Sequence, residues 1–427
     1  MAVVGDMGMR NEQRDTVAGQ DHELSGGHGM KSIELFAGAG GLALGVSRAG
    51  FGHTAVVEWD RDACNTLLAN RDAGVAFLAD WPIIQQDVRL LDFSQFAGQV
   101  DFVAGGPPCQ PFSLGGKHQG HRDERNMFPE TVRVVRQVRP RAFMFENVRG
   151  LLRKSFAHYF EYILLQLQYP CIVRHPDERW EDHRARLEKH HLAGVERELE
   201  YRVVFQCLNA ANYGVPQKRD RVLIVGFRTD VGARWCFPPP THSRRALLQE
   251  QWITGEYWDR HRVRSADRPT PPAGLRVELE LTPPEDMQPW RTVRDAIGDL
   301  PDPNTSGSHR YESHVLVPGA RCYVGHTGSP LDEPAKTLKA GDHGVPGGEN
   351  TLRLVDGSVR YFTVREAARL QAFPDDYVFQ ASWTEGMRQL GNAVPVDLAE
   401  VVASRIRHEL RNATGTQATQ PAVVSIQ

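Results

Sequence analysis

One cysteine of this sequence lies in a loop that suits a nucleophile. Cys109 follows two glycines and two prolines, residues 105–108, and Pro111 comes shortly after it. Because glycine and proline keep the loop stiff and non-helical, we expect the thiol to be exposed. A buried structural cysteine is expected inside a strand or helix, as for Cys207. A thiol attacks as its thiolate, which nearby positive charge favours; an inert Cys109 is the alternative.

An acid is expected beside this cysteine. Glu146 and Asn147 end the apolar run 141–148, which predicts a strand next to the one that precedes Cys109. A carboxyl group at that edge, shielded from water, has a raised pKa and can serve as a proton donor. Glu146 is therefore the candidate acid.

Two arginines open the last predicted strand of the first half of the chain. Alternation along a strand places Gln217, Arg219 and Arg221 on one face. Two guanidinium groups on one face can hold a phosphate or a carbonyl oxygen and can favour the thiolate of Cys109. A salt-bridge strip on the surface, with Asp220, is the alternative.

A glycine-rich loop follows the first predicted strand. Residues 36–41 include Gly38, Gly40 and Gly41, which let the backbone approach a ligand closely. The helix that begins after the loop favours polar or anionic groups. In an open parallel sheet the ligand lies beyond the carboxyl ends of the strands, although this loop alone would also fit a dinucleotide enzyme.

Two carboxylates end the next two strands. Glu58 can accept hydrogen bonds from two ribose hydroxyls, and Trp59 can stack on an adenine ring. Asp87 can accept a hydrogen bond from the adenine amino group. Each carboxylate could instead cap the helix that follows it.

Strands alternate with helices through the first half of the chain. This order is typical of an α/β domain with a mostly parallel sheet, and the nearly continuous apolar strands fit a sheet covered on both faces. The predicted strands are 32–36, 53–59, 83–88, 101–105, 141–148, 201–209 and 221–227. The predicted helices are 42–49, 61–71, 129–137 and 159–168, with later ones at 364–373 and 396–410.

Three regions depart from this alternation. Residues 171–198 are charged and helix-prone, and read as a solvated insertion. The stretch 229–361 is rich in proline and predicts a second, loop-rich domain. Residues 1–30 and 412–427 are predicted to be disordered tails.

Composition excludes several classes of protein. The 427 residues are 41% hydrophobic and 24% charged, with a net charge of −3. No apolar run reaches the roughly 18 residues that a membrane helix needs, and the first 30 residues lack a signal-peptide core. The six cysteines are widely spaced, which disfavours structural zinc and disulfides and favours a cytosolic protein. Arginines number 43 against seven lysines, which by itself proves nothing.

Taken in order, these motifs and two later ones resemble those of the DNA (cytosine-5)-methyltransferases. The resemblance runs from Ser32 to about Leu410. One motif would be suggestive, whereas the whole ordered set is highly specific. The matching residues are 36–41, Glu58, Trp59, Asp87, 107–110, 146–148, 217–221, 365–374 and 391–395.

The resemblance implies a class I S-adenosylmethionine-dependent methyltransferase (Rossmann-like) catalytic domain at 31–228. It implies a smaller, loop-rich target-recognition domain at 229–361, and a segment 362–411 that returns to the catalytic domain. S-adenosylmethionine would be the methyl donor, with no metal. The implied cofactor contacts are Phe36, Gly38, Gly40, Glu58, Trp59, Asp87, Val88, Pro108, Asn392 and Val394. The implied catalytic residues are Cys109, Glu146, Arg219 and Arg221, and the implied substrate contacts are Gln110, Ser113, Asn147 and Gln217.

The family's reaction methylates C5 of a cytosine in a specific double-stranded DNA sequence. The thiolate of Cys109 would add to C6 of a flipped-out base while Glu146 protonates N3. Residues 119–125 are predicted to form a loop that closes over the DNA, and 334–339 and 342–344 to contact a groove unless they are ordinary surface loops. The resemblance implies a bacterial, cytoplasmic, nucleoid-associated monomer that accompanies a restriction endonuclease and has no membrane partner.

Other functions fit the sequence less well. Enzymes that methylate exocyclic amino groups need no cysteine, an NAD-dependent oxidoreductase leaves Cys109 and Glu146 unexplained, and a non-catalytic DNA-binding relative would lack the cysteine or the cofactor pocket. A tRNA-modifying relative is the nearest rival, and the long 229–361 stretch favours duplex DNA over it. Two positions depart from the family, Glu34 where aspartate is commoner and Ala372 where glycine is frequent.

Overall fold

The structure is a computed structural model. Several predictions fall outside the residues that it describes: those for Cys109, Gln110, Ser113, the 119–125 loop and residues 342–344, and those for most of both tails. The described residues are 29–108, 126–194, 198–271, 273, 275, 279, 286–322, 327–340, 350–354 and 356–413.

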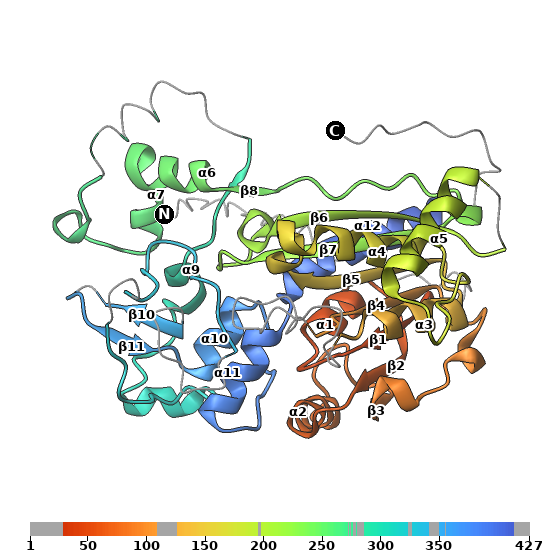
Figure 1. Ribbon diagram of the computed structural model, residues 1–427. Coiled ribbons are helices and arrows are strands. Elements are labelled where there is room, and N and C mark those ends of the chain that lie inside the picture. The colour runs from red at the N-terminus through yellow and green to blue at the C-terminus, as the bar shows by residue number, and fades with distance from the viewer. Residues whose placement is uncertain are drawn as a thin grey trace, which may run out of the picture.

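A seven-stranded sheet with the strand order β3-β2-β1-β4-β5-β7-β6 lies at the centre of the larger lobe (Figure 1). β1 to β5 run parallel, and β7 runs antiparallel to both of its neighbours, β5 and β6. The carboxyl ends of the parallel strands therefore meet at one edge, here called the carboxyl edge, where β7 begins. The strands are β1 (Lys31–Leu35), β2 (Gly52–Glu58), β3 (Ile83–Gln85), β4 (Phe102–Gly105), β5 (Ala142–Val148), β6 (Tyr201–Asn209) and β7 (Asp220–Arg228).

Helices cover both faces of this sheet. Apolar residues of α1 and α12 pack on one face, and those of α3 and α4 pack on the other. The contact between α1 and α12 is close, because a Cβ on Gly45 would lie 2.5 Å from the Cβ of Ala399. The predicted α/β architecture is confirmed. The helices are α1 (Gly41–Arg48), α2 (Arg61–Asp72), α3 (Phe128–Val138), α4 (Ala157–Gln168), α5 (Trp180–Ala193) and α12 (Val396–Asn412).

The charged insertion contains α5, as its composition predicts. Only His183 and Leu187 of this helix are buried, so most of it faces solvent. The helix is attached to α4 through hydrogen bonds between Tyr162 and His183 (2.8 Å) and between Tyr169 and His191 (2.7 Å). No helix in the described ranges has the length and apolar character needed to cross a membrane.

The proline-rich stretch after β7 contains only short elements. They form the smaller lobe of Figure 1 together with α10 and α11. The helix expected at 364–373 ends at Leu370, because Ala372 has a positive φ of 61°. The sequence did not predict α11. The elements are β8 (His242–Ser243), α6 (Arg244–Gln249), α7 (Glu256–Arg260), β9 (Gln288–Pro289), α9 (Val293–Ile297), β10 (Thr351–Arg353), β11 (Val359–Tyr361), α10 (Val364–Leu370) and α11 (Trp383–Asn392).

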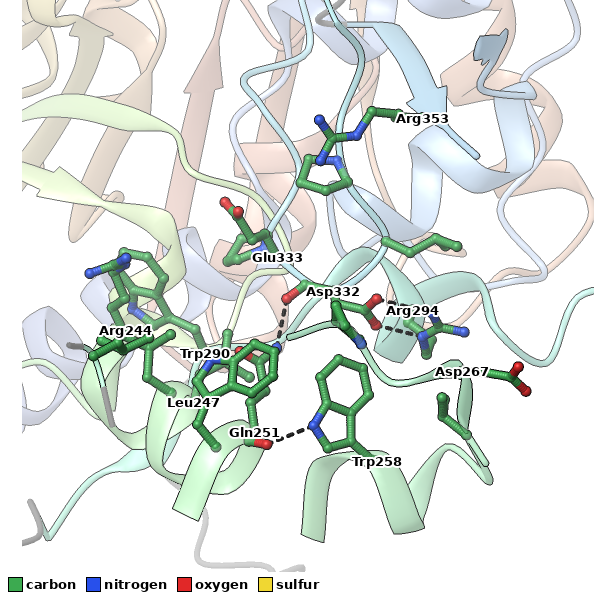
Figure 2. A pocket seen from close by; sticks show the side chains of 18 of the residues that line it. Arg244, Leu247, Gln251, Trp258, Asp267, Trp290, Arg294, Asp332, Glu333 and Arg353 are labelled. Carbon is green, nitrogen blue, oxygen red and sulfur yellow. Dashed lines mark hydrogen bonds and ion pairs between the residues drawn. The ribbon is translucent and has the colours of Figure 1, made fainter. Parts of the chain in front are cut away.

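A small separate core lies around α6 and α7. It contains Trp252, Trp258 and Trp290 beside a cavity of about 690 Å³ (Figure 2). Under the cavity, Asp332 forms an ion pair with Arg294 at 2.6 Å. This cavity lies within the smaller lobe, away from the carboxyl ends of the strands.

Candidate active site

The loop after β1 has an unusual backbone. Phe36, Gly38 and Gly40 have positive φ angles of 56°, 53° and 81°. A Cβ on Gly40 would lie 2.8 Å from Cδ2 of Leu67, whereas a Cβ on Gly38 would meet nothing within 4 Å. A bulky residue such as Phe36 rarely adopts this conformation, and such strain is concentrated at functional sites.

Glu58 fixes this loop to the end of β2. Its Oε2 accepts a hydrogen bond from the backbone N–H of Gly38 at 2.7 Å, and its Oε1 accepts bonds from Trp59 and Asp60 at 2.9 and 2.8 Å. Burial raises the pKa of Glu58, and these backbone bonds oppose the rise. Asp60 is the residue that caps α2, so the capping alternative is wrong for Glu58.

Trp59 and Asp87 lie at neighbouring strand ends. Trp59 is 68% exposed, which is unusual for so large an apolar side chain and suits stacking on a ring. Asp87 lies just beyond β3 and caps the 3-10 helix Val88–Leu90, so here the capping alternative is confirmed. The side chain of Arg89 bonds to Asp87 and lowers the pKa of its carboxyl group. Arg89 contacts both oxygens of this carboxylate, so a ligand contact at Asp87 requires the exposed Arg89 side chain to move.

Two later segments complete the loop. A Cβ on Gly41 would overlap the carbonyl of Val394, so residues 393–396 pack directly on the start of α1. Asn392 precedes this contact and is exposed. Tyr377 is fully buried, and its hydroxyl donates a 2.6 Å hydrogen bond to the carbonyl of Ala39. No sequence motif includes Tyr377, so its role could not be predicted.

Glu146 lies where β5 reaches the carboxyl edge. Its side chain is about nine-tenths buried, and its Oε1 lies 2.5 Å from Nε of Arg221. Burial raises the pKa of Glu146, while the charges of Arg221 and Arg219 oppose the rise. A raised pKa favours the protonated form of a carboxyl group, which is the form that acts as a general acid.

The chain that leads to Cys109 passes directly beside this acid. A Cβ on Gly106 would lie 3.3 Å from Oε2 of Glu146, so glycine leaves room for the carboxyl group. The side-chain amide of Asn147 donates a 3.1 Å hydrogen bond to the carbonyl of Pro107. Asn147 thus fixes the last described residues before Cys109, including the half-buried Pro108, against the end of β5.

Gln217 and Arg219 are buried completely, so the surface salt-bridge alternative is wrong for them. Arg219 donates hydrogen bonds to the carbonyls of Leu338 (2.9 Å), Gly391 (2.6 Å) and Ala393 (2.8 Å). Gln217 accepts a 3.0 Å bond from the N–H of Leu338. Both residues therefore hold backbone of the proline-rich 229–361 stretch, and Arg219 also holds the end of α11, whereas Arg221 faces Glu146.

The two departures from the family have different consequences. Glu34 in β1 is fully buried, and no hydrogen bond to its carboxyl oxygens is found among the described residues. Burial raises its pKa well above the usual range. Ala372 has a φ of 61°, a region that glycine occupies without strain, which explains why glycine suits this position.

Most of the chain matches one known protein family. The family model described as C-5 cytosine-specific DNA methylase matches residues 30–169 and 180–408. This chain belongs to that family. The methylase is 33% identical over 380 residues to the type II methyltransferase M.PspPI of Psychrobacter sp., covering 88% of this chain and 78% of that protein. It is 32% identical over 390 residues to M.NgoMIV of Neisseria gonorrhoeae, covering 89% and 98%.

Solved structures support the fold of the methylase. The Dnmt2 methyltransferase of S. pombe superposes with a TM-score of 0.51 at 16% identity, covering 90% of this chain and 99% of that one. A putative DNA modification methyltransferase from an E. coli prophage gives a TM-score of 0.53 at 20% identity, with the same coverage. These similarities confirm the predicted S-adenosylmethionine-dependent methyltransferase fold.

The methylase is thus a DNA (cytosine-5) methyltransferase, and the family uses S-adenosylmethionine. Its residues fit this cofactor. The open position at Gly38 leaves space above the loop, Trp59 offers an exposed ring, and Glu58 keeps a buried carboxylate beside both. Val394 closes the loop from the opposite side.

Proposed function

We propose that this methylase transfers a methyl group to C5 of a cytosine flipped out of a specific double-stranded DNA sequence, through a covalent bond between Cys109 and C6. The observation that carries the proposal is the buried pair of Glu146 and Arg221, which faces the backbone leading to Cys109. A proton donor beside the segment that leads to the nucleophile suits a reaction in which a cytosine is protonated while the thiolate adds to its ring.

The chemistry explains why both groups are needed. C5 of cytosine is too weak a nucleophile to attack a methyl sulfonium directly. Addition of the Cys109 thiolate at C6, with transfer of the Glu146 proton to N3, gives C5 the character of an enamine. S-adenosylmethionine supplies the methyl group, which C5 takes up, and S-adenosylhomocysteine is released. Solvent water accepts the C5 proton, N3 returns its proton to Glu146, and departure of the Cys109 thiolate restores the aromatic ring.

Three described residues near the active-site carboxyl group have a role in these reaction steps. Arg221 holds the carboxyl group of Glu146 in place at 2.5 Å, and burial raises the pKa of that carboxyl group, which favours its role as a proton donor to N3. Asn147 holds Pro107, two residues before Cys109, against the end of β5. Because C6 is inaccessible inside a duplex, the base must leave the stack, at a cost of a few kcal/mol.

Duplex DNA is the substrate that the chain's organisation favours. We assign the catalytic domain to 31–228 and 362–411 and target recognition to 229–361, a stretch long enough to read a sequence. The curated relatives are named type II methyltransferases. We therefore propose a monomeric, metal-independent bacterial modification enzyme that protects DNA from a cognate restriction endonuclease.

The test begins with the target sequence. Mapping methylated cytosines in DNA from cells that express the chain identifies the site. Duplexes that carry 5-fluorocytosine at that site, incubated with methyl donor, are then expected to form a stable adduct at Cys109, detected by mass spectrometry of the tryptic peptide. A Cys109→Ala variant serves as the control. If wild-type enzyme methylates the site without forming the adduct, the covalent mechanism is wrong; methylation of tRNA alone refutes the DNA assignment.

A further inference from the structure

Three cationic side chains follow β5, the strand that carries Glu146, at the carboxyl edge. Arg149, Arg153 and Lys154 lie on two consecutive 3-10 turns, Arg149–Leu152 and Lys154–Phe156, directly after β5. β5 and β7 pair so that Val148 lies opposite Arg221, the partner of Glu146. These turns therefore leave the sheet beside the proposed acid. We call the three cationic residues the basic rim.

Two of the three charges are available to a partner. Arg149 is 74% exposed but lies 3.0 Å from the carboxylate of Asp220, which offsets part of its charge. Lys154 is exposed and Arg153 is half-buried. Within the part of the chain that the structure describes, neither of these two side chains forms an ion pair.

Several of the other lysines also lie in segments near the carboxyl edge of the sheet. The chain has only seven lysines, and after Lys154 three more lie in segments that adjoin the start of β7: Lys218, Lys336 and Lys339. The backbone N–H of Lys218 donates a 2.8 Å bond to the carbonyl of Ala335, so the two segments lie side by side. Glu333 pairs with Lys218 at 2.9 Å and offsets that charge. Lys218 and Lys336 thus lie near the start of β7, the strand that pairs with the end of β5.

Neither the net charge of the chain nor the charge balance of residues 230–360 explains how this protein would bind DNA. The chain has a net charge of −3, and residues 230–360 contain 18 acidic and 16 basic side chains. Double-stranded DNA carries one negative charge per roughly 1.7 Å of its axis, so binding requires local cationic groups. The basic rim is exposed, largely uncompensated and next to the position where the base would be held.

We propose that Arg153 and Lys154 bind phosphates of the DNA backbone beside the flipped cytosine, with Arg149 adding a weaker contact. The inference rests on the proposed function, because it assumes that the base is held at Glu146. Contacts of this kind position the duplex and carry no sequence information. Their loss therefore weakens binding equally for cognate and unrelated duplexes.

The size of the effect follows from counterion release. The logarithm of the DNA association constant falls with the logarithm of salt concentration with a slope of about −0.9 for each phosphate contact. Removing two contacts reduces the slope by about 1.8. If binding converges near 1 M salt, each contact is worth about eightfold in Kd at 0.1 M.

The test compares R153Q/K154Q with wild type and with R202Q. Arg202 is also exposed, but β6 places it at the opposite edge of the sheet, so it is a matched control. Kd for DNA is measured by fluorescence anisotropy from 50 to about 400 mM salt, a range over which DNA affinity changes enough to determine the slope. We expect the double variant to lose slope and affinity, R202Q to match wild type, and kcat at saturating DNA to stay within about twofold.

The outcomes separate this inference from the proposed function. If wild type methylates DNA but the double variant keeps its slope, or R202Q loses as much slope, the basic rim is not a phosphate site. If wild type forms no methylcytosine in DNA, the proposed function itself fails. The single variant K154Q changes only an exposed side chain and is therefore not expected to disturb folding. Its salt slope is expected to change by about half as much as that of the double variant.

Discussion

Arg219 offers the sharpest test of how the site is assembled. Replacing it in Arg219→Met keeps the length of the side chain and removes every donor. The carbonyls of Leu338 and Gly391 would then be buried without a partner, while Ala393 retains a weak 3.4 Å bond from Gln371. An unsatisfied buried carbonyl costs about 1–3 kcal/mol, and relief from burying a charge offsets part of the loss. We expect a net destabilisation of about 2–4 kcal/mol.

The kinetic consequence distinguishes positioning from contact with the base. Leu338 belongs to the stretch that we propose to read the DNA, whereas Gly391 lies next to the segment that packs on the glycine loop. Arg219→Met is therefore expected to raise KM for DNA and KM for S-adenosylmethionine together, each by about tenfold, which corresponds to about 1.4 kcal/mol. Urea denaturation followed by circular dichroism gives the stability, and initial rates of radiolabelled methyl transfer give both KM values.

Arg221→Met is the matched control, because this arginine pairs with Glu146. We expect a lower kcat, an unchanged KM for S-adenosylmethionine and a smaller loss of stability. The positioning argument is refuted if Arg219→Met leaves stability and both KM values at their wild-type levels and lowers kcat alone, as the control does.

Three further outcomes follow from other groups. Glu146→Gln removes the proton donor and is expected to lower kcat by about 10²–10⁴-fold with little change in DNA affinity, measured in single-turnover assays. Trp59→Ala removes the exposed ring and should weaken S-adenosylmethionine binding by roughly 2- to 10-fold in calorimetry, with DNA binding unaffected. Burial raises the pKa of Glu34 above 4.5, so the folded protein holds a proton that the unfolded chain releases, and stability falls as pH rises from about 4.5 toward the raised value. Glu34→Leu should remove this fall; a pH dependence of unfolding identical to wild type would contradict the assignment.

The sheet could be predicted from the sequence because its signals are local. Most strands are short apolar runs that end at or next to a glycine or a charged residue, and the predicted bounds agree with β1, β2, β4, β5, β6 and β7 to within about one residue. β3 is shorter than predicted, because Asp87 turns the chain into a 3-10 helix. α11 escaped prediction because glycines and polar residues interrupt its apolar face, and because it is stabilised by contacts with α10 that no local pattern records.

The site was predictable in its members and less so in their roles. Glu58 and Glu146 were recognised because each ends a strand at the carboxyl edge. The partners of Arg219 are 119, 172 and 174 residues away, so the sequence could not show that its guanidinium group holds backbone. Tyr377 could not be found for the same reason, since the backbone of Ala39 is its partner.

The bond between Tyr377 and Ala39 spans 338 residues and has a consequence for synthesis. The glycine loop leaves the ribosome early, but the groups that pack on it, Tyr377 and Val394, are translated only after the whole 229–361 stretch. A nascent chain that ends near Leu370 contains every strand of the seven-stranded sheet, yet its glycine loop lacks both of these contacts. The loop is therefore completed late in translation, after the 229–361 stretch has been synthesised.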